Sequence, residues 1–191
     1  QQNDQATACE YLEKTLGIQP NDLGALESLM SLSEKQGHWD EVIRFAVQLL
    51  ELKSEPLEKF DLQLRIGDVY LNQLQQSEDA VLAYRNALDI QPDSKAAHLK
   101  TFQVLVEAES YPEALDTLAR LVELEQDERR KGSYLAAMAD LYREKLDDPE
   151  RAIEYFNQSL DCDPSQLKAF RALDEILTDR KDWQALQKNY R

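Results

Sequence analysis

The side chains that most often perform acid–base or nucleophilic chemistry are scarce in this sequence. It contains two histidines, His38 and His98, and two cysteines, Cys9 and Cys162. His38 falls in an expected turn and His98 on an expected helix, so no base, orienting group and nucleophile can be assembled from them. The cysteines are far apart and neither has a CxxC or histidine partner, which argues against a zinc site or a disulfide framework. Phosphate-binding glycine loops and HExxH motifs are also absent from the sequence. We therefore expect no catalytic residues and no enzyme activity in this chain.

Paired carboxylates are the other groups with suitable chemistry, because Ca²⁺ and Mg²⁺ take carboxylate oxygens as ligands. Asp147 and Asp148 form one pair, and Asp161 and Asp163 form another. Neither pair has the EF-hand spacing, and both fall in expected turns, where aspartate is favoured because it hydrogen-bonds to the backbone. The sequence therefore predicts no metal site and no cofactor.

Charge and composition narrow the class of partner. The formal net charge is −15, from 22 Lys and Arg against 37 Asp and Glu. A nucleic-acid-binding surface must bring cations to the phosphates, so we expect no nucleic-acid partner, whereas a basic protein partner is compatible with this charge. No run of about 18 apolar residues is available to cross a membrane, so we expect no membrane partner. The compartment stays open: cytoplasmic by default, or periplasmic or another if an upstream signal was removed.

Internal repetition is the main signal about the elements that would position a binding site. Pro20, Pro92 and Pro164 are spaced by 72 residues. Three further sets of similar residues keep the same spacing: Ala8, Ala80 and Ala152; Leu16, Leu88 and Leu160; Trp39, Tyr111 and Trp183. Glycine and proline are rare, so each 72-residue repeat unit is expected to be helical. A unit of this length is too long for one helical hairpin and is expected to divide into two helix–turn–helix halves of about 36 residues.

Two of these halves carry a specific pattern of residue sizes. A large and a small residue precede an aromatic one on the first helix, and a small–aromatic–small series and a proline follow on the second. The pattern is carried by Ile66, Gly67, Tyr70, Ala80, Tyr84, Ala87 and Pro92. It recurs in Met138, Ala139, Tyr142, Ala152, Phe156, Ser159 and Pro164. In this pattern the sequence resembles the tetratricopeptide repeat (TPR) family, and looser versions of it cover nearly the whole chain.

The resemblance implies an all-α fold, a right-handed superhelical solenoid of helix–turn–helix repeats. Residues 1–191 are then expected to form a single array of about five hairpins, with partial repeats at both ends and a period of two hairpins. The first helices of the hairpins, the A helices, are expected at 22–36, 58–75, 94–109, 128–146 and 165–180. The second helices, the B helices, are expected at 4–18, 39–53, 78–90, 112–125, 149–161 and 182–191. The turns after Tyr70 and Tyr142 carry one extra residue, and Phe102 and Asp174 stand where the family has small residues.

The resemblance also implies where a partner would bind, because the A helices of this family line a concave surface that binds peptides or segments of other proteins. A stripe of residues beside the core positions follows each A helix and changes between units; Glu27, for example, is replaced by Leu99 and then by Arg171. The stripes of the last two A helices include Ser133, Ala136, Lys168 and Glu175. From the stripes, the expected groove residues are Leu64, Asp68, Leu71, Leu99, Gln103, Val106, Asp140 and Arg143.

A bound segment is expected to place an apolar side chain against Leu64, Leu71, Leu99 and Val106, and acidic neighbours favour a basic residue beside that anchor. The alternative is that these residues pack against neighbouring A helices.

The function expected from the sequence is that of a scaffold or adaptor that binds a partner protein or peptide. A second hypothesis is a regulatory or substrate-recruiting region of a larger enzyme whose catalytic module lies outside this segment. End-to-end self-association through the open ends of the array is a further possibility. An acidic chaperone tail is a poor ligand for these stripes, because they lack the converging Lys, Asn and Arg residues that TPR domains use for such tails.

Overall fold

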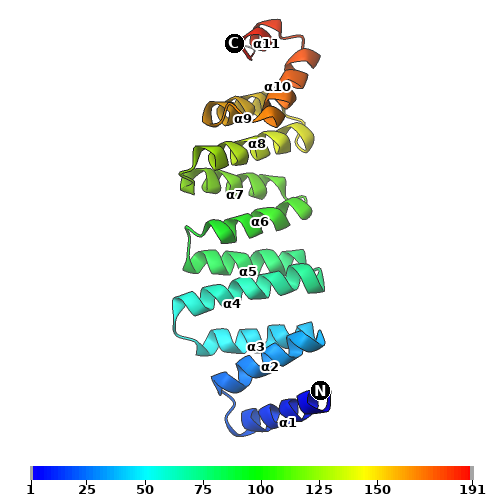
Figure 1. The fold of residues 1–191 in the computed structure, drawn as a ribbon, viewed down its shortest axis with the longest axis vertical. Coiled ribbons are helices and arrows are strands. Elements are labelled where there is room, and N and C mark those ends of the chain that lie inside the picture. Colours follow the sequence, from blue (N-terminus) through cyan, green and yellow to red (C-terminus); the bar gives the residue numbers. More distant parts are fainter. Residues whose placement is uncertain (1, 190–191) are drawn as a thin grey trace. The chain divides into compact units, whose positions relative to one another are not determined.

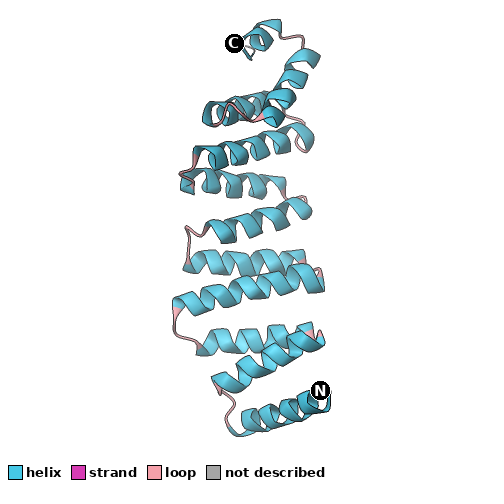
Figure 2. Cartoon of the chain, in the orientation of Figure 1, coloured by secondary structure: helices cyan, strands magenta, loops and turns pink. Residues whose placement is uncertain are grey.

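The chain is all-α. The computed structural model describes residues 2–189, and all regular elements in that range are helices (Figure 2). The fold class predicted from the sequence is therefore confirmed. Two compact units make up the chain, Gln1–Ala97 and His98–Arg191.

The first unit is built from helical hairpins. Its elements are α1 (Gln2–Ile18), α2 (Leu23–Gln36), α3 (Trp39–Leu52), α4 (Pro56–Val69), the short π-helix η1 (Tyr70–Leu74) and α5 (Ser77–Ile90). Helix α2 packs on α3, and α4 packs on α5, as Figure 1 shows. Helix α6 (Lys95–Glu107) begins in this unit and continues into the second. Leucine, valine and phenylalanine side chains dominate the core, which contains Leu26, Leu29, Val42, Phe45, Leu49, Leu62 and Ile66.

The second unit repeats this construction. It contains α7 (Tyr111–Leu124), α8 (Glu128–Glu144), α9 (Pro149–Cys162), α10 (Leu167–Asp179) and α11 (Trp183–Asn189). Helices α8 and α9 form a closely packed hairpin, and α10 packs on α9. Its buried side chains include Leu118, Leu121, Leu135, Met138, Phe156 and Leu173. Each predicted helix is present with its ends displaced by a few residues, and the predicted last two residues of the final helix lie outside the described residues.

The extra turn residue after Tyr70 and after Tyr142 is accommodated by the same backbone hydrogen bond, which spans six residues, at both places. After Tyr70 the predicted α-helix continues instead as η1, and Gln76 N donates to Tyr70 O over 2.9 Å. After Tyr142 the equivalent bond runs from Asp148 N to Tyr142 O, also over 2.9 Å. Gln75 and Asp147 each adopt a left-handed backbone conformation, with φ of 56° and 51°. A wide turn ending in a left-handed residue is therefore part of the repeat.

One aspartate of each acidic pair accepts a backbone hydrogen bond in its turn. Asp148 Oδ1 accepts from Arg151 N at the start of α9, with Pro149 in the first turn. Asp163 Oδ1 accepts from Ser165 N over 3.1 Å and from Ser165 Oγ over 2.6 Å. These two bonds lower the pKa of Asp163. No group of three or more His, Cys, Asp or Glu side chains suited to a metal ion occurs among the described residues.

The remaining turns between A and B helices also repeat every 72 residues. The residues at 37, 109 and 181 have positive φ: 75° for Gly37, 57° for Glu109 and 56° for Lys181. The residue after each donates its N–H to the carbonyl five residues earlier, over 2.9, 2.8 and 2.9 Å. This is the hydrogen-bond pattern of a Schellman motif, for which glycine is the favoured residue.

Replacing Gly37 by alanine is expected to destabilise the chain by about 1 kcal/mol, the cost of a side chain in the left-handed region. An added Cβ would meet only Trp39 Nε1, at 3.9 Å, so the loss would come from the backbone rather than from a clash. The measurement is the midpoint of urea unfolding compared with the parent. Gly24→Ala is the control, because Gly24 lies in a helix without positive φ; an equal loss in both variants would contradict the assignment.

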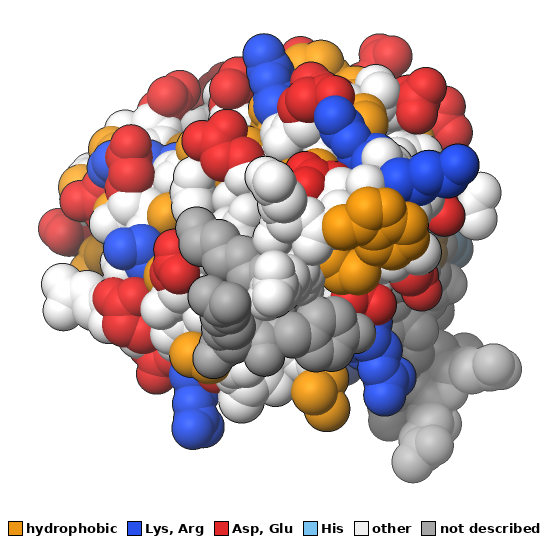
Figure 3. All heavy atoms as spheres, turned by 90° about the horizontal axis from the view of Figure 1, so that it is seen from above, with side chains coloured by type: hydrophobic (Ala, Val, Ile, Leu, Met, Phe, Trp, Pro, Cys, Tyr) orange, Lys and Arg blue, Asp and Glu red, His pale blue; other side chains and the backbone are white. Residues whose placement is uncertain are grey.

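The described surface is mixed in charge and carries small apolar areas. On the face drawn in Figure 3, acidic side chains are spread among basic and uncharged ones, with hydrophobic side chains between them. Among residues 2–189, no helix combines the length and apolar character needed to cross a bilayer.

Candidate functional site

A groove in the second unit lies between the two A helices α8 and α10, with α9 behind them. Its volume is about 510 Å³. Small or apolar side chains form part of its lining: Ala136, Ala137, Phe156, Ala169 and Ala172. Polar and charged side chains complete it: Ser133, Asp140, Arg143, Glu144, Gln166, Lys168, Arg171 and Glu175. We call this the α8–α10 groove.

Local sequence signals place the helices that carry these groups. Helix α8 begins after Asp127, whose Oδ1 accepts from Arg130 N over 3.0 Å. Ser159, which is fully buried on α9, donates through Oγ to the carbonyl oxygen of Gly132 over 2.8 Å. Its Oγ also lies 3.0 Å from Oε1 of Gln166, just before α10. One buried hydroxyl therefore joins the start of α8, helix α9 and the start of α10.

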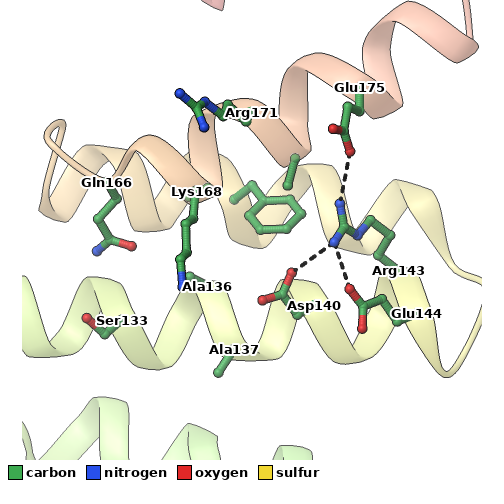
Figure 4. A pocket seen from close by; sticks show the side chains of 13 residues that line it. Ser133, Ala136, Ala137, Asp140, Arg143, Glu144, Gln166, Lys168, Arg171 and Glu175 are labelled. Carbon is green, nitrogen blue, oxygen red and sulfur yellow. Dashed lines mark hydrogen bonds and ion pairs between the residues drawn. The ribbon is translucent and has the colours of Figure 1, made fainter.

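Arg143 is the electrostatic centre of one end of the groove. Its guanidinium lies 2.7 Å from Glu144, 3.5 Å from Asp140 and 3.6 Å from Glu175 (Figure 4). The side chain of Arg143 is 29% exposed, and its guanidinium lies 5.9 Å from the centre of the Phe156 ring. Burial raises the pKa of Asp140, and Glu144 adds to this, while Arg143 and Lys168 oppose it. Three carboxylates around one cation leave this end of the groove acidic.

Lys168 and Arg171 supply positive charge elsewhere on the α10 side of the groove. Figure 4 shows Lys168 reaching toward Ala136 of α8, with Arg171 farther along α10. Neither cation forms an ion pair with another described residue, whereas Arg143 has three acidic neighbours. The groove therefore has an acidic cluster around Arg143 and two cations on its α10 side, and its lining also includes small side chains such as Ala136 and Ala172.

The predicted groove residues fall in different surroundings. Asp140 and Arg143 are brought together in the α8–α10 groove. On α6, Leu99 is 40% exposed, Gln103 is exposed and Val106 is half-buried. Gln103 Nε2 donates to Glu107 Oε1 over 3.3 Å along the same helix. These three residues do not line the α8–α10 groove.

The predicted residues of the first unit make structural contacts. Leu64 is half-buried and packs against the cluster of Phe60, Ala87 and Ala97. Asp68 Oδ1 accepts a 2.7 Å hydrogen bond from the Tyr84 hydroxyl, which ties α4 to α5. Leu71 is half-buried in η1. Their remaining outward faces are what a partner could contact.

Ion pairs cross the A-helix surface of the first unit. Lys53 Nζ lies 2.8 Å from Glu27 and 3.0 Å from Glu58, and Arg65 Nε donates to Glu34 over 2.7 Å. The hydrogen bonds to Glu27 and Glu58 raise the pKa of Lys53. A partner on this surface would have to displace paired charges.

The stripes read from the sequence include Ser133, Ala136, Lys168, Arg171 and Glu175, all of which line the groove. Phe156 and Gln166 were not among the expected groove residues. Phe156 has the pattern of a core residue, and Gln166 lies before the predicted core positions of its helix. Only the packing of α8, α9 and α10 shows that both border the groove.

Comparison with known proteins agrees with this architecture. The tetratricopeptide repeat family model matches residues 60–94 and 132–166, two segments that start 72 residues apart. A search of the curated proteins gave no match.

Among solved structures, the chain is similar to YrrB, described as a TPR protein with an unusual peptide-binding site, at 19% identity and a TM-score of 0.58, covering 89% of this chain and 84% of that one. It is similar to MamA from Desulfovibrio magneticus RS-1 at 19% identity and a TM-score of 0.54, covering 86% and 89%. It is also similar to the N-terminal domain of stress-induced protein-1 from C. elegans at 16% identity and a TM-score of 0.56, covering 65% and 98%. The resemblance seen in the sequence is thereby confirmed: residues 60–94 and 132–166 match the tetratricopeptide repeat model, and the chain has a fold shared with solved TPR proteins.

Proposed function

We propose that this chain is a protein-binding scaffold and that the α8–α10 groove holds an extended segment of a partner protein. TPR folds are typically interaction scaffolds without catalysis of their own. The observation that carries the proposal is the groove itself, in which charged residues of two successive A helices flank small and apolar side chains. The description of YrrB as a TPR protein with a peptide-binding site supports the same class of ligand.

The charges of the groove indicate the chemistry of the segment. A Lys or Arg of the partner would be favoured beside Asp140, Glu144 and Glu175, where Arg143 neutralises only part of the negative charge. An acidic group of the partner would be favoured beside Lys168 and Arg171. Because the side chains between these ends are small, an apolar side chain of moderate size fits between the charged contacts. Opposite charges at the two places would also fix the direction in which the segment binds.

A peptide library displayed on phage tests this proposal, because it samples all charge arrangements without a known partner. Selection on the parent chain is expected to enrich peptides that carry a basic residue, an apolar residue and an acidic residue in one order. The dissociation constant of a synthetic enriched peptide is then measured by fluorescence anisotropy. Enrichment without any charge preference would contradict the assigned ligand chemistry.

Arg171→Glu is expected to weaken the enriched peptide about fivefold or more, roughly 1 kcal/mol, because it reverses an exposed charge in the groove. Ala136→Trp is expected to weaken it further by filling the space between α8 and α10. Arg44→Glu, on α3 of the first unit, is the matched charge-reversal control and should leave the affinity unchanged. Unchanged binding to both groove variants would exclude this groove as the site.

Leu99→Glu tests whether the predicted binding surface on α6 contacts the partner in addition to the α8–α10 groove. Loss of affinity in this variant, with the unfolding midpoint of the parent retained, would extend the bound segment to α6. If Leu99→Glu binds as the parent does while Arg171→Glu does not, the segment is confined to the α8–α10 groove.

A further inference from the structure

A second cleft, in the first unit, lies between the B helices α3 and α5 and over α4. Its volume is about 260 Å³. Mostly apolar side chains line it, together with three polar ones: Val47, Leu50, Ile66, Tyr70, Leu82, Ala83, Gln63, Asp79 and Asn86. Leu82 is 58% exposed and Val47 is 45% exposed, so large apolar groups face water there. We call this the α3–α5 cleft; its helices are seen in Figure 1.

The repeat shows what the chain itself places at the equivalent position of the hairpin α8–α9. Tyr142, 72 residues after Tyr70, is stacked on Tyr155 of α9, with ring centres 5.4 Å apart and planes inclined by 5°. The guanidinium of Arg151 lies 5.3 Å from the centre of the Tyr142 ring, and its Nη1 donates to the Tyr142 hydroxyl over 3.3 Å. An aromatic ring and a cation therefore cover Tyr142.

The first unit has the same tyrosine without that cover. Ala83 stands 72 residues before Tyr155, and Asp79 stands 72 residues before Arg151. Tyr70 has no stacked aromatic ring among the described residues, and it borders the cleft together with Ala83 and Asp79. The α3–α5 cleft thus occurs where the second hairpin has a ring and a guanidinium.

Two acidic residues exert an electrostatic effect on the uncovered tyrosine, and one of them, Asp79, lines the cleft beside it. Burial is the largest cause that raises the pKa of Tyr70, and the negative charges of Asp79 on α5 and Asp40 on α3 raise it further. Negative charge near the ring favours a positively charged neighbour, and a second ring can stack on an aromatic face. The absence of an equivalent ring and guanidinium and the local negative charge therefore both indicate a ligand with an aromatic ring and a positive charge.

We propose that the α3–α5 cleft binds an aromatic side chain of a partner protein that carries Arg or Lys beside the ring. The partner's ring stacks on Tyr70 between Val47 and Leu82, in the space that Tyr155 fills in the other hairpin. Its cation lies beside Asp79, where Arg151 stands in the other hairpin. This site is separate from the α8–α10 groove and lies on B helices as well as on α4.

Titration with short peptides, followed by the amide signals of the ¹⁵N-labelled chain, tests the site without a known partner. The probe is acetyl-Gly-Arg-Tyr-Gly-amide, added to about 10 mM because such a small ligand is expected to bind in the millimolar range. Saturable shifts are expected at residues 47–50, 66–70 and 79–86. Acetyl-Gly-Glu-Tyr-Gly-amide and acetyl-Gly-Arg-Ala-Gly-amide are the controls and should each bind several-fold more weakly. Equal binding of all three peptides, or no saturable shift in these segments, would overturn the proposal.

A second experiment fills the cleft with side chains of the chain itself. The variant Asp79→Arg/Ala83→Tyr copies the second hairpin, so it should place its own ring on Tyr70 and abolish the peptide shifts. Asp79→Lys leaves the apolar walls intact and should weaken the Arg-Tyr peptide several-fold while leaving acetyl-Gly-Glu-Tyr-Gly-amide bound at least as well. Since Ala83 is buried, the filled variant Asp79→Arg/Ala83→Tyr could fail to fold, and circular dichroism detects such a loss of helix. In that case the effect of Asp79→Lys on binding of the two tyrosine peptides tests the proposal.

Sedimentation of the parent and of the filled variant shows whether the cleft is occupied by a different protein or by a second copy of this chain. A parent that remains monomeric supports a different protein as the partner. Self-association that disappears in the filled variant would overturn that assignment, because the cleft would then be an interface between copies.

Discussion

Gly67→Ala is expected to destabilise the first unit by roughly 3 kcal/mol, at the upper end of the cost of overpacking a core. A Cβ at this position would lie 2.6 Å from Cδ1 of Tyr84 and closer still to Cε1. The Tyr84 ring cannot retreat easily, because it is fully buried and its hydroxyl donates to Asp68 over 2.7 Å. The measurement is the urea-unfolding midpoint, with helix content followed by circular dichroism.

Three further substitutions check that the loss comes from this contact. Gly17→Ala is the matched control, since nothing lies within 4 Å of a Cβ there and alanine favours helix by up to about 1 kcal/mol. Tyr84→Phe keeps the ring and should not relieve the clash in the double variant with Gly67→Ala, whereas Tyr84→Leu should relieve part of it. If the Gly67→Ala chain is as stable as the parent, α4 and α5 must be farther apart than they are in this structure.

Phe156→Ala is expected to destabilise the second unit by about 3–5 kcal/mol, because the substitution removes a large buried ring and leaves a cavity. Phe156 is 1% exposed, and it borders the α8–α10 groove from α9. Chemical denaturation of the parent and the variant measures the difference.

Leu167→Ala is the comparison, since Leu167 lies on α10 of the same unit but is 66% exposed; a change within about 0.5 kcal/mol is expected there. Phe156→Leu retains most of the apolar volume and should lose less than Phe156→Ala. Similar losses for Phe156→Ala and Leu167→Ala would show that Phe156 is not part of the core.

The elements of this fold could be predicted because their signals are local and repeated. Helix ends are marked by residues such as Pro149 in a first turn and Gly37 in a left-handed turn, and the 72-residue period checks each position against its equivalents. The extra residue after Tyr70 was visible in the sequence as an insertion. That it forms a π-helix depends on which carbonyl each N–H reaches, and residue types alone do not specify this.

The binding surface was predicted less completely, and the reason is geometric. Each residue turns a helix by about 100°, so a stripe beside the core is separated from a packed position by a small error in register. The sequence placed Asp140 and Arg143 on such a stripe, and they do line a groove. It could not show that Leu64 packs against the cluster that includes Ala87 of α5, or that Asp68 is bonded to Tyr84, because those contacts depend on how two helices approach each other.

By itself, then, the sequence determined the helices, their pairing into hairpins and the family they resemble, because short-range propensities and a repeat of constant spacing specify all three. Tertiary structure alone decided where space remains between the helices. The α8–α10 groove depends on small side chains meeting across α8 and α10. The α3–α5 cleft exists because Ala83 and Asp79 stand beside Tyr70, where the other hairpin has Tyr155 and Arg151 beside Tyr142. Cavities are set by the sizes of side chains from several helices at once, and their positions appear only when those helices are packed together.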